Sequence, residues 1–472
     1  MRIEQIYTAC LAEATYYIES DGEAAIIDPL RDPAPYLERA AADRAKIKYV
    51  LETHFHADFV SGHLDLAKLS GATIVFGPTA APAYAAHVAK DGEILTLGRS
   101  KIKVLHTPGH TMESTTYLLI DETGQDIAAF TGDTLFVGDV GRPDLVQKLK
   151  AEITPELLAG HLFDSLRQKI MKLPDDVLIY PGHGAGSACG KKMDKATVST
   201  IGIQKKLNYA LRETMTREEF IHEVLDGLTE PPQYFPGNVL MNIKGSPNLQ
   251  DVLHRGLKAL DARSFHNIWK RTNATVIDTR SKAAFPAEFV KGSIFIGIDD
   301  SFAPWVGTLI DDLNQPILII ADDGKEEEVI KRLARVGYDN AQGYLKNGVI
   351  AWIAAGEETD TIEEISASQF EEEFQKHPTL DLLDVRRASE FTTEHMEGAF
   401  NFPLESINRN IRFLDSHKTY YVYCAGGYRS LIATSILKSR GIANVVNIQN
   451  GFNALRQTSL NRTAPVQLNT EL

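Results

Sequence analysis

The sequence is poor in cysteine, in tryptophan and in long apolar runs. Its 472 residues include three cysteines and three tryptophans. Three cysteines form no disulfide framework, so a reducing compartment is expected and the chain is predicted to be cytoplasmic. Met1 to Gln5 lack the apolar core of a signal peptide, and no apolar run approaches the roughly 20 residues that cross a bilayer. No membrane partner is therefore predicted.

Positive charge is also in short supply. Lys and Arg total 49 against 63 Asp and Glu, which gives a formal net charge of −14. Because such a chain repels a polyanion, general nucleic-acid binding is not expected. The remaining composition, 43% hydrophobic and 24% charged, is that of a globular protein. The length predicts about three domains at roughly 150 residues each.

Histidine and aspartate stand at the ends of predicted strands in the N-terminal half. Four apolar runs are typical of buried strands: 47–51, 102–105, 127–130 and 177–180. The residues that follow them, in turns rich in Gly or Pro, include His54, His56, Asp58, His110, Asp133 and His183. Imidazoles and carboxylates at neighbouring strand ends can converge on one ion, and a set of two His and one carboxylate suits iron as well as zinc.

These motifs resemble those of the metallo-β-lactamase superfamily across roughly residues 1–230. The resemblance implies an αβ/βα sandwich with metal at the strand ends. One position departs from the superfamily pattern H-x-H-x-D-H, because Phe59 replaces the last His and has no lone pair for a second metal. The chain is therefore most similar to the persulfide dioxygenases of this superfamily, which hold one non-haem Fe(II).

The resemblance implies roles for the motif residues. His54, His110 and Asp133 would hold Fe(II), one per chain. Around them, the residues expected to line the site or hydrogen-bond to the ligands are His56, Asp58 and His183. The implied substrates are dioxygen and a small-molecule thiol persulfide, and the implied product is sulfite.

Two residues in glycine-rich loops are candidates for handling sulfur. Arg142 follows the Asp133 turn and is predicted to grip an anionic substrate, with an ion pair to Asp144 as the alternative. Cys189 follows His183, and we interpret it as a reactive catalytic thiol at the mouth of the metal site. Two lysines directly after it, Lys191 and Lys192, are expected to favour its thiolate.

Two other residues are interpreted as packing. Cys10 lies in a stretch of small residues and is expected to be a buried apolar residue. Tyr234 lies in the Pro-rich segment 231–236, and packing is favoured over a place in the substrate channel.

The C-terminal half contains two weakly similar copies of about 105 residues each. Residues 276–280 (Val-Ile-Asp-Thr-Arg) match 382–386 (Leu-Leu-Asp-Val-Arg), and Asn347-Gly348 matches Asn450-Gly451. Alternating strands and helices predict two small parallel-sheet α/β domains. The predicted domains are therefore 1–245, 255–357 and 365–472.

A nucleophile is predicted in the second copy. Cys424 stands between the predicted strand 420–423 and a helix, where the helix dipole, backbone N–H groups and Arg429 would stabilise a thiolate. The C-x-x-G-x-R loop, with Asp384-Val385-Arg386 upstream, resembles the rhodanese sulfurtransferases. That resemblance implies Cys424 and Arg429 as catalytic residues. Gly427 and Tyr428 are predicted to bind substrate.

The first copy lacks this nucleophile. After its strand 317–320 stand Ala321, Asp322 and Asp323 in place of a cysteine. We interpret 255–357 as an inactive rhodanese-like domain that serves as a spacer or an interface.

The whole chain resembles the bacterial fusion of a persulfide dioxygenase with two rhodanese domains, used in sulfide detoxification. An enzyme is predicted that oxidises persulfide sulfur to sulfite and transfers sulfane sulfur to form thiosulfate. Two alternatives stay open: a glyoxalase II-like zinc thioesterase fused to a rhodanese, and a persulfide sensor or sulfur-carrier scaffold. A homo-oligomer is expected. The sequence leaves open the carrier thiol (glutathione, coenzyme A, bacillithiol or sulfide) and whether sulfur moves within or between subunits.

Overall fold

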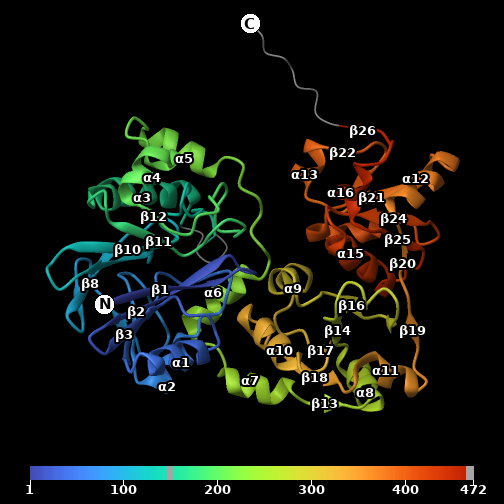
Figure 1. The fold of residues 1–472 in the computed structure, drawn as a ribbon, viewed down its shortest axis with the longest axis horizontal. Coiled ribbons are helices and arrows are strands. Elements are labelled where there is room, and N and C mark those ends of the chain that lie inside the picture. The colour runs from blue at the N-terminus through green and yellow to red at the C-terminus, as the bar shows by residue number, and fades with distance from the viewer. Residues whose placement is uncertain (146–152, 464–472) are drawn as a thin grey trace, which may run out of the picture. The chain divides into compact units, whose positions relative to one another are not determined.

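The structure is a computed structural model that describes residues 1–145 and 153–463 (Figure 1). The chain folds into two compact units. The first comprises 1–252 with the short segments 311–313 and 331–339, and the second comprises the remaining residues from 253 onward. The predicted third domain, 365–472, ends in residues 464–472, which lie outside the described part. Within the described residues, no helix has the length and apolar character needed to cross a bilayer.

Two mixed sheets form the centre of the first unit, and among the described residues each has six strands. The first sheet runs in the order β1 (Arg2–Thr8), β2 (Glu13–Ser20), β3 (Glu23–Ile27), β4 (Lys46–Leu51), β5 (Thr73–Phe76) and β6 (His87–Val88). The second runs in the order β12 (Ser199–Thr200), β11 (Leu178–Pro181), β10 (Asp126–Gly132), β9 (Thr115–Ile120), β8 (Ser100–His106) and β7 (Ile94–Leu97). The four strands predicted before the metal motifs are all present.

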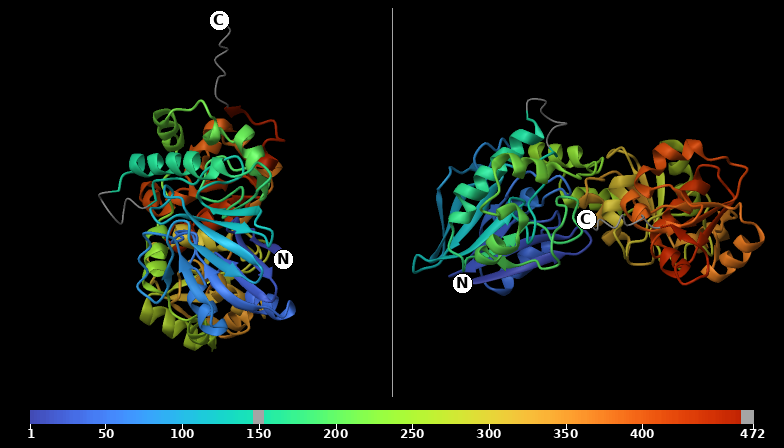
Figure 2. Two further views of the ribbon diagram at one scale, coloured as in Figure 1. Left: turned by 90° about the vertical axis from the view of Figure 1, so that its left-hand side faces the viewer. Right: turned by 90° about the horizontal axis from the view of Figure 1, so that it is seen from above.

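Helices cover the outer faces of these sheets, as the views of Figure 2 show. Their bounds are α1 (Ala34–Ala42), α2 (His63–Ser70), α3 (Pro155–Gln168), η1 (Ile170–Lys172), α4 (Ile201–Leu207), η2 (Tyr209–Leu211), α5 (Arg217–Leu225) and α6 (Phe235–Lys244). Helix α7 (Leu249–Gly256) follows in sequence and includes the division between the two units. Tyr36 and Leu66 bring α1 and α2 onto the first sheet. Leu162 and Phe220 bring α3 and α5 onto the second. Since Tyr16 and other apolar residues fill the space between the sheets, the unit is the expected αβ/βα sandwich.

Helix α2 begins at His63, four residues after Phe59. The amides of Val60, Ser61 and Gly62 donate to the carbonyl of Arg335, the side chain of Asn242 and the carbonyl of Pro29. Since these amides have partners elsewhere, the backbone after the metal motif stays non-helical until His63.

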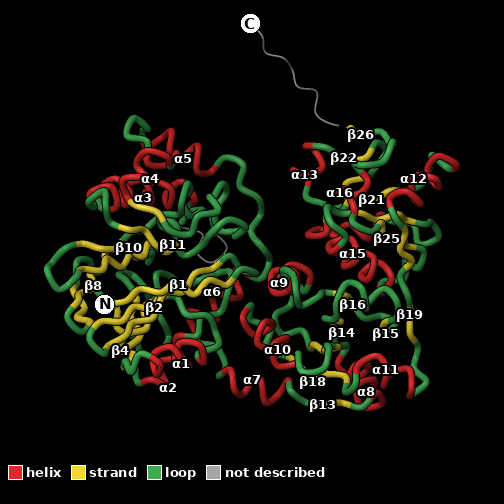
Figure 3. The backbone as a smooth tube through the Cα atoms, in the orientation of Figure 1, coloured by secondary structure: helices red, strands yellow, loops and turns green. Residues whose placement is uncertain are grey.

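The second unit repeats one architecture twice, and Figure 3 shows its strands and helices alternating along the chain. In the first copy the sheet order is β13 (Ala259–Leu260), β18 (Ala341–Leu345), β17 (Ile317–Ile320), β14 (Thr275–Asp278) and β16 (Ile294–Phe295). In the second it is β20 (Glu363–Ile365), β25 (Val445–Ile448), β24 (Tyr420–Tyr423), β21 (Asp381–Asp384) and β23 (Phe400–Asn401). The two sheets have the same order and parallel pairing, so the predicted duplication is confirmed.

Helices pack on both sheets of this unit. Those of the first copy are α8 (Ala262–Thr272), α9 (Phe302–Leu309), α10 (Glu326–Arg335) and α11 (Gly348–Ala354). Those of the second are α12 (Ala367–Lys376), α13 (Ala388–Thr393), α14 (Ile407–Asn410), α15 (Tyr428–Ser439) and α16 (Gly451–Leu455), with η3 (Leu404–Ser406) and η4 (Ile411–Phe413). Short ribbons pair β15 (Phe289–Val290) with β19 (Thr359–Asp360), and β22 (His395–Met396) with β26 (Arg462–Thr463).

Each copy contains the same Asp–Arg ion pair just after the second strand of its sheet, counted along the sequence. The Arg280 guanidinium binds the carboxylate of Asp278 and donates to the carbonyl of Glu288. In the second copy Arg386 makes the matching contacts with Asp384 and the carbonyl of Glu394. The matched Asp-x-Arg sequences are therefore a structural feature of both copies.

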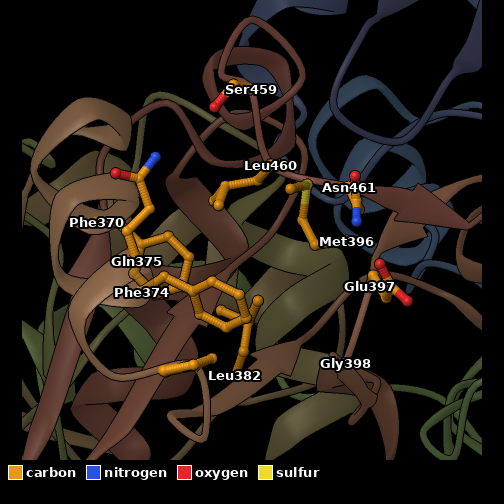
Figure 4. A pocket seen from close by; sticks show the side chains of 11 residues that line it. Phe370, Phe374, Gln375, Leu382, Met396, Glu397, Gly398, Ser459, Leu460 and Asn461 are labelled. Atoms are coloured by element: carbon orange, nitrogen blue, oxygen red, sulfur yellow. The ribbon is translucent and has the colours of Figure 1, made fainter.

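A hollow of about 460 Å³ opens in the second copy beside α12 (Figure 4). Its apolar wall includes Phe374, Met396 and Leu460. Since its lining includes no residue of 424–429, this hollow is distinct from the loop that carries Cys424.

Candidate functional site

The first candidate site is the predicted metal set. His54 follows β4, His110 follows β8 and Asp133 follows β10, and one ligand atom of each lies within 4.8 Å of the others. All three side chains are buried. Three positions far apart in the sequence therefore meet because the strand ends gather at one edge of the sandwich.

Hydrogen bonds hold each imidazole of this set with the same nitrogen facing inward. His110 Nδ1 lies 2.8 Å from the carbonyl oxygen of Arg142, an acceptor that requires N–H at Nδ1. His54 Nδ1 lies 2.9 Å from the hydroxyl of Thr53, which itself donates to Asp28 at 2.8 Å. In both rings Nε2 therefore faces the other members of the set, which is the nitrogen that would bind a metal. Burial, followed by the neighbouring imidazoles, lowers the pKa of His54 well below its usual range, which also favours the neutral ring.

Asp133 supplies the clearest sign that an ion belongs here. Within the described part of the chain, both of its buried carboxylate oxygens are without a hydrogen-bond partner. One oxygen lies 3.4 Å from Nε2 of His110, and the other lies 3.6 Å from Nε2 of His183. An unsatisfied buried carboxylate is costly, and a cation would compensate it. The donors present, two imidazoles and a carboxylate, fit iron or zinc.

His56 has a different environment. Its Nε2 lies 3.0 Å from Asp28 and 3.5 Å from Glu52, and its ring stacks on Phe59 at 4.2 Å. Burial alone would lower the pKa of His56, but the two carboxylates raise it well above its usual range. The ring is therefore held in a buried network of charges next to the metal set, and its supporting role stays a prediction.

A second trio lies beside the first. Ligand atoms of Asp58, His183 and Cys189 are within 4.8 Å of one another, and all three residues are buried. His183 Nδ1 faces the carbonyl of Ala12 at 3.2 Å, so its Nε2 faces Asp58 and Asp133. The structure thus brings the predicted loop cysteine next to the metal set through Asp133.

The expected activation of Cys189 by lysines is wrong. Lys191 Nζ donates to the carbonyls of Glu223 and Asp226, away from the thiol. The amides of Lys191 and Lys192 both donate to Asp139. Burial, followed by the carboxylates of Asp58 and Asp133, raises the pKa of the Cys189 thiol well above its usual range. Composition alone could not show which way the lysine side chains point.

Arg142 is engaged by the protein in this structure. Its guanidinium binds the carboxylate of Asp144 at 2.7 and 2.8 Å and donates to the carbonyls of Ala188 and Thr229. Its backbone N–H also donates to the carbonyl of Cys189. The Asp144 pair that the sequence offered as the alternative is formed, and these contacts brace the Cys189 loop. Substrate binding by Arg142 stays a prediction.

Several supporting residues were missed at the sequence level. Asn242 of α6 donates to the carbonyls of His56 and Phe59 and accepts from the amide of Ser61. Asp28 accepts from both the amide and the hydroxyl of Thr53. Both residues contact the loop after β4 from distant positions in the sequence, so no local motif marks them.

Cys10, which was expected to be buried, is only half-buried, and Arg335 lies 3.6 Å from its sulfur.

The second candidate site is the Cys424 loop, between β24 and α15. The amide of Gly427 donates to Cys424 Sγ at 3.1 Å, as expected of a cysteine at a helix start. Gly427 has φ +95° and Gly451 has φ +49°, and a Cβ on Gly451 would lie 2.1 Å from the Cys424 carbonyl oxygen. Glycine at both positions therefore sets the shape of the loop.

Arg429 and Tyr428 both have partners within the protein. Arg429 forms a two-point ion pair with Glu390 at 2.6 and 2.8 Å, so its charge beside Cys424 is largely compensated. The hydroxyl of Tyr428 donates to the carbonyl of Gly297 in the first copy at 3.0 Å. The positive charge that the sequence predicts beside the thiol is therefore held in an ion pair. The catalytic role of Arg429 and the substrate role of Tyr428 stay predictions.

Comparisons with known proteins agree with this architecture. The metallo-β-lactamase superfamily profile matches residues 9–183, and the rhodanese-like domain profile matches 261–355 and 366–458. A solved metallo-β-lactamase structure from Staphylococcus aureus is 33% identical, with a TM-score of 0.64. The match covers 73% of this chain and 98% of that one.

Two curated relatives point to two activities. Human persulfide dioxygenase ETHE1, mitochondrial, is 30% identical over 247 residues, which are 51% of this chain and 87% of that protein. Hydroxyacylglutathione hydrolase cytoplasmic from Arabidopsis thaliana is 34% identical over 182 residues, which are 38% of this chain and 66% of that protein.

Together these findings define a metal-site hydrolase fold joined to two sulfurtransferase-type domains. The chain belongs to the metallo-β-lactamase superfamily, among the relatives of persulfide dioxygenase ETHE1, and carries two rhodanese-like domains after its metallo-β-lactamase domain.

Proposed function

We propose that this chain is a persulfide dioxygenase coupled to a sulfurtransferase in sulfide detoxification. Its first unit would oxidise the outer sulfur of a small-molecule thiol persulfide to sulfite, and Cys424 would move sulfane sulfur, giving thiosulfate when sulfite accepts it. One Fe(II) per chain, held by His54, His110 and Asp133, would supply the activation of dioxygen.

The observation that carries the proposal is the metal set itself. Two oriented imidazoles and one unsatisfied carboxylate leave several coordination positions for other ligands. Holding the reactants at adjacent positions converts a bimolecular encounter into a local step. Phe59 supports one metal in preference to two, because it fills the place of a ligand and stacks on His56.

The chain's own groups would control the surroundings of this step. Thr53 and the carbonyl of Arg142 fix the two imidazoles, and Asn242 fixes the loop between them and α2. The buried side chains exclude bulk water from the reacting sulfur. His183 and Asp58 lie where a proton leaving the substrate could be held.

Cys189 is proposed as a sulfur acceptor beside the metal set. Its sulfur lies close to atoms of Asp58 and His183. If it accepts sulfur, Cys189→Ser should keep its iron but slow product formation or release sulfite in place of thiosulfate. Mass spectrometry of substrate-treated wild type should find added sulfur on Cys189. An unmodified Cys189, together with an unchanged rate and product ratio in the variant, would return this residue to a structural role.

A glyoxalase II-like zinc thioesterase is the second candidate function. The trio Asp58, His183 and Cys189 sits across Asp133 from the metal set and has donors suited to zinc. Such a site would hold a second metal despite Phe59. The similarity to a hydroxyacylglutathione hydrolase also favours this alternative.

Anaerobic metal analysis followed by activity assays separates these functions. We expect about one iron per chain and oxygen uptake with one or more persulfides of glutathione, coenzyme A, bacillithiol or sulfide. Two firmly held zinc ions per chain with thioester hydrolysis would favour the alternative. A persulfide-binding scaffold would show neither catalytic oxygen uptake nor hydrolysis.

A further inference from the structure

The cysteine-free copy reaches the Cys424 loop of its neighbour. The hydroxyl of Tyr428, four residues after Cys424, donates to the carbonyl of Gly297, and its ring lies 5.8 Å from that of Phe295. The amide of Phe295 also donates to Ser435 on α15. The segment 295–300 of the first copy is therefore hydrogen-bonded to α15, the helix that follows the Cys424 loop.

This segment ends in two exposed carboxylates. Asp299 and Asp300 lie two and three residues after Gly297, whose carbonyl accepts from Tyr428, and both are exposed. Their negative charges, after burial, help to raise the pKa of Tyr428, which places them within electrostatic reach of the Cys424 loop. They also precede α9, where acidic residues commonly stabilise a helix start, so a purely local role is the alternative.

The other charges beside Cys424 leave little positive potential. Arg429 is paired with Glu390, and Arg386 is paired with Asp384. Glu405 is near enough to Arg429 to help raise that residue's pKa. With both arginines paired, neither cation offsets the exposed carboxylates of Asp299 and Asp300, for which the described residues provide no ion-pair partner.

We propose that Asp299 and Asp300, which we call the acidic lip, disfavour the binding of doubly charged sulfur donors at the Cys424 site. The cysteine-free copy would thus set the donor specificity of its neighbour. The lip rests on the proposed sulfurtransferase function of Cys424 and gives the cysteine-free copy a specificity role. Donors with a single negative charge, such as a persulfide anion, are favoured over donors with two, such as thiosulfate.

The donor selectivity can be measured in the step in which Cys424 takes sulfur from thiosulfate or from a thiosulfonate. The Cys424 thiolate attacks the outer sulfur of thiosulfate, a new S–S bond forms on Cys424, and the old S–S bond breaks. Sulfite leaves with the bonding electron pair. The reactants, a thiolate and the thiosulfate dianion, carry a total charge of −3, and so do the products, a persulfide anion and the sulfite dianion. Cyanide then takes the outer sulfur as thiocyanate and restores the thiolate.

The test compares a dianionic donor with a monoanionic one. With the full chain and cyanide as acceptor, kcat/KM is measured for thiosulfate and for methanethiosulfonate over a range of NaCl concentrations. Two unit charges about 10 Å from a dianion should change its kcat/KM by roughly threefold to tenfold at low ionic strength. In wild type the value for thiosulfate should therefore rise with salt. In Asp299→Asn/Asp300→Asn it should be higher at low salt and nearly flat.

Two further variants complete the series. Asp299→Lys/Asp300→Lys should reverse the salt dependence for thiosulfate. Asp21→Asn/Glu122→Gln removes two charges from exposed residues of the first unit, and it should behave as wild type.

An unchanged donor ratio and salt dependence in the Asn and Lys variants would overturn the lip. If those variants instead lowered only the thermal unfolding midpoint, the carboxylates would be helix-start residues alone. Failure of the proposed function gives a different result, because Cys424→Ser would then keep its transferase activity.

Discussion

The two candidate sites hold their reactive atoms by different means. At the metal set, three side chains from separate strand ends converge, and hydrogen bonds from the imidazoles to Thr53 and to the Arg142 carbonyl orient the rings. At the Cys424 loop, one side chain is surrounded by main chain, with the Gly427 amide on its sulfur and Gly451 packed under its carbonyl. The first site therefore depends on side-chain identity, and the second depends mainly on backbone shape.

The first prediction is the largest and isolates the metal set. His110→Ala removes a ligand, so it should cost more than the roughly 10–100-fold in metal affinity that loss of an outer partner costs. Iron and oxygen uptake should be lost while thiosulfate:cyanide transfer continues. Metal analysis and an oxygen electrode measure the effect. His87→Ala is the matched control, because this exposed histidine pairs with Glu93 away from the set. Full iron content in His110→Ala would reject the assigned ligand.

The second prediction isolates the sulfur loop. Cys424→Ser replaces the sulfur that would carry sulfane sulfur with an oxygen that cannot, so transferase activity should fall by about a thousandfold or more. Iron content should be unchanged. A thiocyanate assay with thiosulfate and cyanide reads out the loss, and persistence of the activity would mean that another cysteine is the carrier.

The third prediction tests whether side-chain orientation governs the metal set. Thr53→Val removes the hydroxyl between His54 and Asp28 while keeping a similar shape. Iron affinity should fall by roughly 10–100-fold, the usual cost of losing an outer hydrogen-bond partner. Thr53→Ser, which keeps the hydroxyl, should retain most of the affinity in competition with a chelator. Equal affinities for the two variants would show that the hydroxyl does not orient His54.

The fourth prediction is the smallest and tests whether backbone shape governs the sulfur loop. Gly451→Ala should lower transferase activity by about tenfold and stability by about 1–3 kcal/mol, because the added Cβ meets the Cys424 carbonyl. Gly441→Ala is the control, since Gly441 also has a positive φ, +89°, but has open space where a Cβ would lie. The control should lose stability but keep transfer activity. Kinetics and urea unfolding distinguish the two, and equal activities would contradict the argument.

Much of the fold and part of the candidate sites could be predicted from sequence. Apolar runs that end in His or Asp mark the strand ends, and the repeated Asp-x-Arg marks the duplicated domain. Both features are local patterns, and both are present in the structure. The start of α2 could not be predicted, because the partners of the amides just before it, such as Asn242, lie far along the chain.

The remaining features depend on directions and distant partners. Lys191 stands two residues from Cys189, yet its side chain turns toward the carbonyls of Glu223 and Asp226. Arg429 was expected to stabilise a thiolate, and no local pattern indicated that Glu390 on α13 binds it. A sequence gives charge and spacing, whereas the direction of a long side chain is decided by acceptors that only tertiary packing brings near.

The main chain of Arg142 links both trios of the first unit. Its carbonyl accepts from His110, while its amide donates to the carbonyl of Cys189. Opening of the Cys189 loop far enough to free that amide would therefore strain the orientation of a metal ligand. Binding a metal makes such an opening less favourable by the free energy of binding. Hydrogen–deuterium exchange at the Arg142 amide should thus slow when the site is loaded, which makes this single N–H a reporter of metal occupancy that needs no substrate.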